Sequence, residues 1–208
     1  MKNSSNTVVD HLRTQILDGA ISPDQPIRQD LIAEELAVSR TPVRQALHQL
    51  AGEGLVTYDA NRGARAAPIL ATDVRDLFDM RLALEQIALA AAFQSHDKRV
   101  WAEAEMALDR AEQTTDALLL GQENAAFHMA LYAPCERDLL LNTISGLTKR
   151  GVRSEIIALS IGTRSDQSDA EHHALLAACR TGKLENAQNI LTAHLVSARD
   201  DTLAVLKS

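Results

Sequence analysis

Three histidines and an asparagine in the second half of the chain have the residue types and spacing of a metal site. Asn124 and His128 lie four residues apart in "ENAAFHMAL", so they share one face of a helix. His172 opens a further helix in "AEHHALL", and His194 lies among apolar residues in "LTAHLVSA". Helical bundles build metal sites from inward side chains of facing helices. We therefore consider these four residues as a candidate set of metal ligands inside a bundle.

A simpler interpretation exists for each of these histidines. A single buried histidine is more often hydrogen-bonded than bound to a metal, and His173 is expected to face solvent. A hydrolytic metal centre would also need a general base beside its metal-bound water. The nearest carboxylate, Glu123, neighbours Asn124 in the chain and so points off the shared face. We expect a binding site and not an enzyme, and spacing alone leaves the metal and hydrogen-bonded interpretations open.

Arginines in "SRTPVRQAL" are the second group of residues with a chemical use. Pro42 is tolerated only in the first turn of a helix, so this helix begins near Ser39 to Thr41. Its first turn then presents Arg40, Thr41 and Arg44 outward. The first turn of a recognition helix reaches base edges and phosphates in the major groove, and arginine can bind guanine through O6 and N7. Solvated arginines at a helix start are the alternative for an isolated stretch of this kind.

The elements around this stretch favour the DNA-binding interpretation. A three-residue break at 37–39 separates two helices, and a further helix precedes them, which is the spacing of a helix-turn-helix unit. "LVTYDANRGARAAPI" then predicts a hairpin with Arg62 and Arg65 at its tip, although residues 64–67 are poor strand formers. Those arginines would contact phosphate or enter the minor groove. The expected helices cover residues 5–19, 28–36 and 40–52, and the hairpin covers 55–69.

The rest of the chain predicts helices only. Aromatic residues make up 3% of the chain, which disfavours strands. Turn-forming stretches separate six expected helices, at 73–94, 97–118, 119–134, 136–161, 166–180 and 184–206. We expect a mainly α protein with a winged helix-turn-helix domain and an all-α antiparallel bundle of about six helices. The expected domains are residues 1–68 and 75–208, joined by a linker at 69–74.

The net charge of −7 does not exclude DNA binding, because the acidic excess is unevenly distributed. Residues 1–68 hold 7 Lys and Arg against 8 Asp and Glu, whereas residues 69–208 hold 14 against 20. DNA binding depends on local charge and not on the total. The two cysteines match no disulfide framework or zinc-finger spacing, and no signal peptide or membrane-spanning run is evident. We expect a cytoplasmic protein with no membrane partner.

The first third of the chain resembles a known family. "LIAEELAVSRTPVRQALHQLAGEGLV" followed by "NRGARAAPI" is similar to the winged helix-turn-helix of GntR-family bacterial transcription regulators, over residues 8–69. Ala37 stands where the family often has glycine, Asp30 stands where many members are basic, and the wing lacks its usual aromatic or β-branched residue. The resemblance implies DNA contacts from Arg40, Thr41, Arg44, Gln45, Arg62, Gly63 and Arg65.

The remaining two-thirds resembles the FCD effector domain of the FadR-type branch of this family. The similar motifs are "MRLALE", the helix 124–131, "EHHALL" and the closing "AHL". The resemblance implies a divalent metal held by one aspartate and three histidines. Asn124 stands at the aspartate position, and the histidine positions are His128, His172 and His194. A neutral amide is a weaker ligand, but three imidazoles still suit zinc or nickel.

The resemblance also implies a small carboxylate effector that binds the metal and an arginine. Arg81 is the first candidate, although a surface ion pair with Glu85 is an alternative for it. Arg150 and Arg153 are further candidates that solvent alone would also satisfy. We expect a ligand-responsive transcription regulator, either a repressor or an activator, that binds a palindromic operator as a homodimer. The alternatives are a regulator with a metal-free pocket, a metalloenzyme, and a winged helix used for protein contact.

Overall fold

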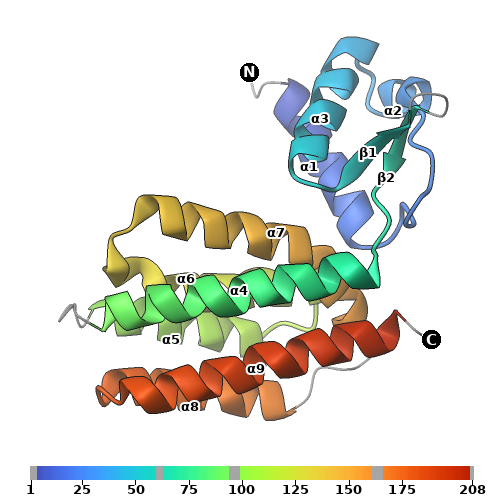
Figure 1. The fold of residues 1–208 in the computed structure, drawn as a ribbon. Helices are drawn as coiled ribbons and strands as arrows, with labels where there is room; N and C mark the ends of the chain where they lie inside the picture. Colours follow the sequence, from blue (N-terminus) through green and yellow to red (C-terminus); the bar gives the residue numbers. More distant parts are fainter. Residues whose placement is uncertain (1–3, 60–62, 94–98, 161–165, 207–208) are drawn as a thin grey trace. The chain divides into compact units, whose positions relative to one another are not determined.

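The protein consists of two compact units, Met1–Ile69 and Leu70–Ser208. The computed structural model describes residues 4–59, 63–93, 99–160 and 166–206, with the backbone alone at 4–5, 99–100, 152–160 and 166. Both units are drawn in Figure 1. We call them the first unit and the second unit. No helix within the described residues is both long enough and apolar enough to cross a bilayer.

The first unit is a three-helix assembly followed by a hairpin (Figure 1). Its third helix packs against the first two helices and against the first strand. Val43, Leu47 and Leu50 are fully buried on one face of that helix, which is the apolar spacing that predicted it. The elements are α1 Ser4–Leu17, α2 Gln29–Glu35, α3 Arg40–Gly52, β1 Val56–Asp59 and β2 Gly63–Ala66. The predicted winged helix-turn-helix fold is confirmed.

The hairpin forms even though its second strand is rich in alanine. β1 and β2 pair antiparallel, from Val56 opposite Ala66 to Asp59 opposite Gly63. The loop before α2 lies along the other edge of β2, where Ala66 N–H bonds the Gln25 carbonyl and Ile27 N–H bonds the Ala64 carbonyl. Backbone bonds on both edges, and burial of the small alanine side chains, outweigh weak strand propensity.

The second unit is a bundle of six long helices within the described residues, as predicted (Figure 1). α4 packs against α6, α7 and α9, while α8 packs against α9 and α5. This packing brings α6, α8 and α9, the helices that bear the histidines, into one core. The elements are α4 Ala71–Ala92, α5 Arg99–Glu112, α6 Ala117–Tyr132, α7 Asp138–Ser160, α8 Asp166–Arg180 and α9 Leu184–Val205, with a 3-10 turn at Ala133–Cys135.

The start of α4 and the end of α5 differ from the sequence-based expectations. α4 begins at Ala71 and so occupies most of the segment expected as the linker 69–74. Its apolar face already starts at the buried Val74, and Asp73 in the first turn interacts favourably with the helix dipole. α5 ends at Glu112 and not at residue 118, because Asp116 caps the next helix by accepting the Leu119 N–H at 2.9 Å.

The turn between α2 and α3 contains a strained residue. Ala37 has a φ of +52°, in the left-handed region that favours glycine. Ala37 is also exposed, so its methyl group gains little from packing. We expect Ala37→Gly to raise the free energy of unfolding of the first unit by about 1 kcal/mol, because relief of strain exceeds the entropy cost of glycine.

Urea unfolding followed by circular dichroism would measure this change. Ala51→Gly provides a control, since Ala51 lies in the last turn of α3, where its right-handed backbone gives glycine no strain to relieve and glycine costs up to about 1 kcal/mol relative to alanine. Equal destabilisation by both substitutions would contradict the strain at Ala37.

Candidate DNA-contacting surface and histidine cluster

The first turn of α3 presents the predicted DNA-contacting side chains to solvent. Arg40, Thr41, Arg44 and Gln45 are all exposed, while the opposite face of α3 is buried. α3 begins at Arg40, as the position of Pro42 predicted. This turn therefore combines a fixed backbone with side chains that are accessible to a ligand.

A ring contact joins α3 to the hairpin. His48 of α3 stacks on Tyr58 of β1 with ring centroids 5.0 Å apart. Partial burial raises the pKa of Tyr58, and the nearby charge of Arg44 opposes that shift. Arg44 therefore lies close to Tyr58 of β1, which places the first turn of α3 (the recognition turn) and the hairpin (the wing) on one connected surface.

The expected position of Arg65 is wrong. Arg65 does not lie at the hairpin tip but within β2, opposite Thr57. Its Nε donates to the Asp24 carboxylate at 2.9 Å, and a terminal nitrogen donates to the Asp24 carbonyl. Arg65 thus links the loop before α2 to β2 of the hairpin. The two paired residues are 41 positions apart, so no local sequence pattern predicts the pair. Gly63 begins β2 with a φ of +74°, and Arg62 lies outside the described residues.

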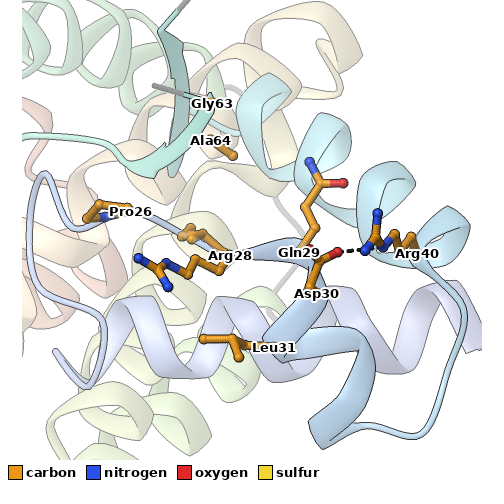
Figure 2. A pocket seen from close by; sticks show the side chains of 9 residues that line it. Pro26, Arg28, Gln29, Asp30, Leu31, Arg40, Gly63 and Ala64 are labelled. Atoms are coloured by element: carbon orange, nitrogen blue, oxygen red, sulfur yellow. Dashed lines mark ion pairs between the residues drawn. The ribbon is translucent and has the colours of Figure 1, made fainter. Parts of the chain in front are cut away.

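A pocket lies beside the recognition turn, between the start of α2 and the wing (Figure 2). Arg28, Asp30 and Arg40 line it together with Gly63 and Ala64. An ion pair joins the Arg40 Nε to the Asp30 carboxylate across this pocket. Asp30, which departs from the family pattern, therefore directly contacts the predicted DNA-binding residue Arg40.

The three predicted histidines meet in the core of the second unit. His128 of α6, His172 of α8 and His194 of α9 each place one ring nitrogen within 4.8 Å of the others. All three side chains are buried, and the Nε2 atoms of His172 and His194 are 3.2 Å apart. Asn124 is half-buried, one turn before His128 on α6. Helix packing thus joins residues that are up to 66 positions apart in the chain.

The spacing of these ring nitrogens suits the binding of a zinc ion. Two imidazoles on one tetrahedral zinc ion, at about 2.05 Å each, have their nitrogens about 3.3 Å apart. The separation of His172 and His194 has this size. The same separation also fits a direct hydrogen bond between the rings. The donor set therefore fits a divalent metal, while its geometry is equally that of a hydrogen-bonded cluster.

Two side chains that the sequence analysis did not single out orient the histidines. Glu171 accepts a hydrogen bond from His194 Nδ1 at 3.0 Å, which leaves Nε2 of that ring as the acceptor atom. Tyr132 donates to the Glu85 carboxylate at 2.7 Å, so its oxygen can accept from His128 Nδ1 at 3.3 Å. Two sequence signals could have identified them: Glu171 directly precedes His172, and Tyr132 lies one helical turn after His128.

The predicted effector arginines have different environments. Arg81 donates to Glu85 at 2.7 Å, as its alternative interpretation held, but this pair is buried and not on a surface face. Arg81 also lies over the Phe78 ring, 5.1 Å from its centroid. Through Glu85, Arg81 is connected to the histidine cluster. Arg150 is exposed on α7, and the side chain of Arg153 lies outside the described residues.

Comparisons with protein families decide what these two sites belong to. The family described as "Bacterial regulatory proteins, gntR family" matches residues 4–65, and the FCD domain family matches residues 76–197. The chain belongs to the GntR family and carries an FCD domain. The sequence resemblance is thereby confirmed for both units of this GntR regulator.

Curated relatives of this GntR regulator match nearly its whole length. The HTH-type transcriptional repressor GlaR of Escherichia coli (strain K12) is 29% identical over 200 residues, covering 89% of this chain and 90% of that protein. The Nta operon transcriptional regulator of Aminobacter aminovorans is 28% identical over 191 residues, covering 89% and 88%. These relatives are transcription regulators, which is the general function of the family.

Solved structures of GntR proteins share this fold. A GntR family member from Pseudomonas syringae pv. tomato str. DC3000 is 29% identical, with a TM-score of 0.60 over 98% of this chain and 86% of that chain. A transcriptional regulator GntR from Rhodococcus sp. RHA1 has a TM-score of 0.82 at 22% identity, over 97% and 98% of the two chains. The second likeness supports the fold alone.

Electrostatics keep the central imidazole of the regulator neutral. Burial lowers the pKa of His128 well below its usual value, and the neighbouring His194, His172 and Arg81 lower it further. The hydrogen bond from His194 lowers the pKa of Glu171, which keeps that carboxylate ionised. A neutral ring with an oriented lone pair can bind a metal ion or accept a hydrogen bond.

The buried His128 makes stability depend on pH. Because its folded pKa lies below its unfolded pKa, the unfolded chain binds the extra proton as the pH falls below about 6.5. We expect the metal-free second unit to lose stability between pH 7.5 and pH 5.5, by at most about 1.4 kcal/mol per pH unit from this group.

Thermal unfolding of chelator-treated protein across this pH range would measure the effect. A His128→Gln variant keeps a polar side chain that does not titrate, so its stability should depend less steeply on pH. Parallel pH profiles for the variant and the wild type would contradict the assignment of the effect to His128.

Proposed function

We propose that this GntR regulator is a ligand-responsive repressor that binds a palindromic operator as a homodimer. The exposed first turn of α3, with Arg40, Thr41, Arg44 and Gln45, supports placement of that turn in the major groove. Its backbone is held by buried contacts of the opposite face, so DNA binding requires little reorganisation of α3. A two-fold dimer would present two such turns to two half-sites.

Exposed apolar residues support self-association of the second unit. Met80 and Ile87 lie seven residues apart on one face of α4, and each is nearly half exposed. Leu139 at the start of α7 is 84% exposed. Large apolar side chains at the surface are common where a second copy binds. A homodimer through the second unit is the assembly that we propose for operator binding.

The effector site that we propose is the histidine cluster. The observation that carries it is the convergence of His128, His172 and His194 in a buried core. These residues, with Asn124 beside them, would hold a zinc or nickel ion, and Glu171 would orient one of the imidazoles. A bound ion supplies positive charge to an anionic ligand. A small carboxylate is therefore the effector class that we propose, and Arg81 is the nearby cation connected to this core.

A metal-free effector pocket is the second candidate. The imidazoles of His172 and His194 can bond one another, and His128 has Tyr132 as a partner. These contacts give each ring at least one hydrogen-bond partner without an ion. A metalloenzyme is disfavoured by the position of Glu123, because that carboxylate accepts from Arg110 at 2.9 Å.

Operator binding tests the DNA-contacting surface. Duplexes selected from a randomised pool by the wild-type protein should bind it with an affinity that falls steeply as salt rises. Arg44→Ala should weaken binding to the selected duplex about 10- to 100-fold, because it removes a contact to a base or phosphate. Arg137→Ala is the matched control, since Arg137 is an exposed arginine of the second unit. Unchanged affinity in the Arg44 variant would exclude α3 as the recognition helix.

Metal analysis tests the effector site. Protein purified without chelator should contain divalent metal at less than one equivalent, and His128→Ala or His194→Ala should lose it. Asn124→Asp should bind the metal about 10- to 100-fold more tightly, because a carboxylate is an anionic ligand. His173→Ala is the control, since His173 is exposed and bonds Glu112. If a variant lacking all three cluster histidines kept the wild-type metal content, the metal-free pocket would replace this site.

A further inference from the structure

A carboxylate occupies the surface of the first unit that is proposed to face DNA. Asp30 is the second residue of α2, and Arg40 is the first residue of α3. Figure 2 shows the two side chains facing one another beside the pocket. Their ion pair joins the Arg40 Nε to the Asp30 Oδ1 at 2.5 Å. Both are largely exposed, with 74% of the Arg40 side chain and 63% of the Asp30 side chain accessible.

Stability does not account for this pair. An ion pair between exposed side chains contributes about 0–1 kcal/mol, since water screens the charges and ordering two side chains costs entropy. A carboxylate beside a DNA-binding arginine also repels phosphate, so Asp30 would weaken a surface that bound DNA by charge alone. Asp30 also interacts favourably with the dipole of α2 from its first turn, by about 0.3–1 kcal/mol. Beyond this modest gain, the carboxylate is placed to affect how Arg40 binds DNA.

The contacting atoms indicate what that effect is. The guanidinium group carries five N–H donors in a rigid planar fork. The Asp30 carboxylate forms an ion pair on the Nε side of the Arg40 guanidinium and so favours one placement of that group. The two terminal nitrogens retain N–H groups that can reach guanine O6 and N7 together. An arginine restrained in this way loses less rotamer entropy when it binds a base edge.

The same carboxylate favours base edges over phosphates as binding partners of Arg40. Guanine O6 and N7 are neutral acceptors, whereas a phosphate oxygen beside Asp30 would bring two anions together. Arg28 extends away from the Asp30–Arg40 pair in Figure 2, so it remains a cation of this pocket that does not share the carboxylate. Phosphate and base contacts can thus be divided between these two arginines.

We propose that Asp30 is a specificity-determining residue, which restrains Arg40 for a guanine edge and repels phosphate from it. This proposal rests on the proposed placement of the first turn of α3 in the major groove. Asp30 keeps affinity for unrelated DNA low while the selected sequence retains its contact. The acidic departure from the family pattern is therefore a source of discrimination between sequences.

Asp30→Asn tests this role, because asparagine keeps the shape and removes the charge. The two probes are a duplex selected from a randomised pool by the wild-type protein and a scrambled duplex of equal length and composition. The variant should bind the scrambled duplex about 3- to 10-fold more tightly and the selected duplex no more tightly, as expected when one arginine is released to phosphates. The salt dependence for the scrambled duplex should steepen by about one unit of log–log slope.

Two further variants identify the cause. Glu34→Gln removes one exposed negative charge from the same helix, and it should leave the ratio of the two affinities within twofold of the wild type. In an Arg40→Ala background, Asp30→Asn should no longer change that ratio, because the pair is already broken. Circular dichroism of each variant checks that the fold is retained.

Three outcomes would overturn the role of Asp30: an unchanged affinity ratio in Asp30→Asn, an equal change in Glu34→Gln, or the full effect without Arg40. The operator test with Arg44→Ala separates this failure from failure of the proposed function. If Arg44→Ala weakens binding while Asp30→Asn leaves the ratio unchanged, α3 reads DNA without help from Asp30. A wild-type chain that selects no duplex would overturn both proposals.

Discussion

Burial of a charged pair beside three imidazoles is the constraint on which the second unit depends. Arg81 and Glu85 lie in the core, where charges are costly unless their hydrogen bonds are satisfied. Tyr132 meets this requirement by donating to Glu85, and its oxygen lies next to His128. The pairing partners of α4 and α6 are thereby specified, because a shift of either helix would leave a buried polar group without its partner. The histidine cluster is positioned by the same network.

In the first unit, by contrast, the ion pair beside the proposed DNA contacts is exposed to solvent. Arg40 and Asp30 pair at the surface, where water screens the interaction and DNA can compete for it. Apolar side chains on the inner face of α3 carry the stability of the unit, so its outer face can be varied with little effect on folding. Discrimination between DNA sequences can therefore change at positions such as Asp30 while the fold is kept.

Local pattern predicted most of the elements but not their ends. The start of α3 followed from the φ restriction of Pro42, and the helical spacing of apolar residues predicted the bundle. The gap between α5 and α6 was misplaced because the capping function of Asp116 was not recognised. The wing formed despite its alanines because backbone bonds to the preceding loop completed both edges of β2.

The sequence by itself predicted the two-domain organisation, the exposed first turn of α3 and the three histidines that meet in the core. These predictions were possible because periodicity, proline geometry and motif spacing are local properties. Only the tertiary structure decided which side chains meet. It placed Arg65 within β2, bonded to Asp24, and not at the hairpin tip, and it buried the Arg81 pair that a surface helix would expose. Such pairings join residues on different elements, and their energies depend on burial, which a linear pattern does not contain.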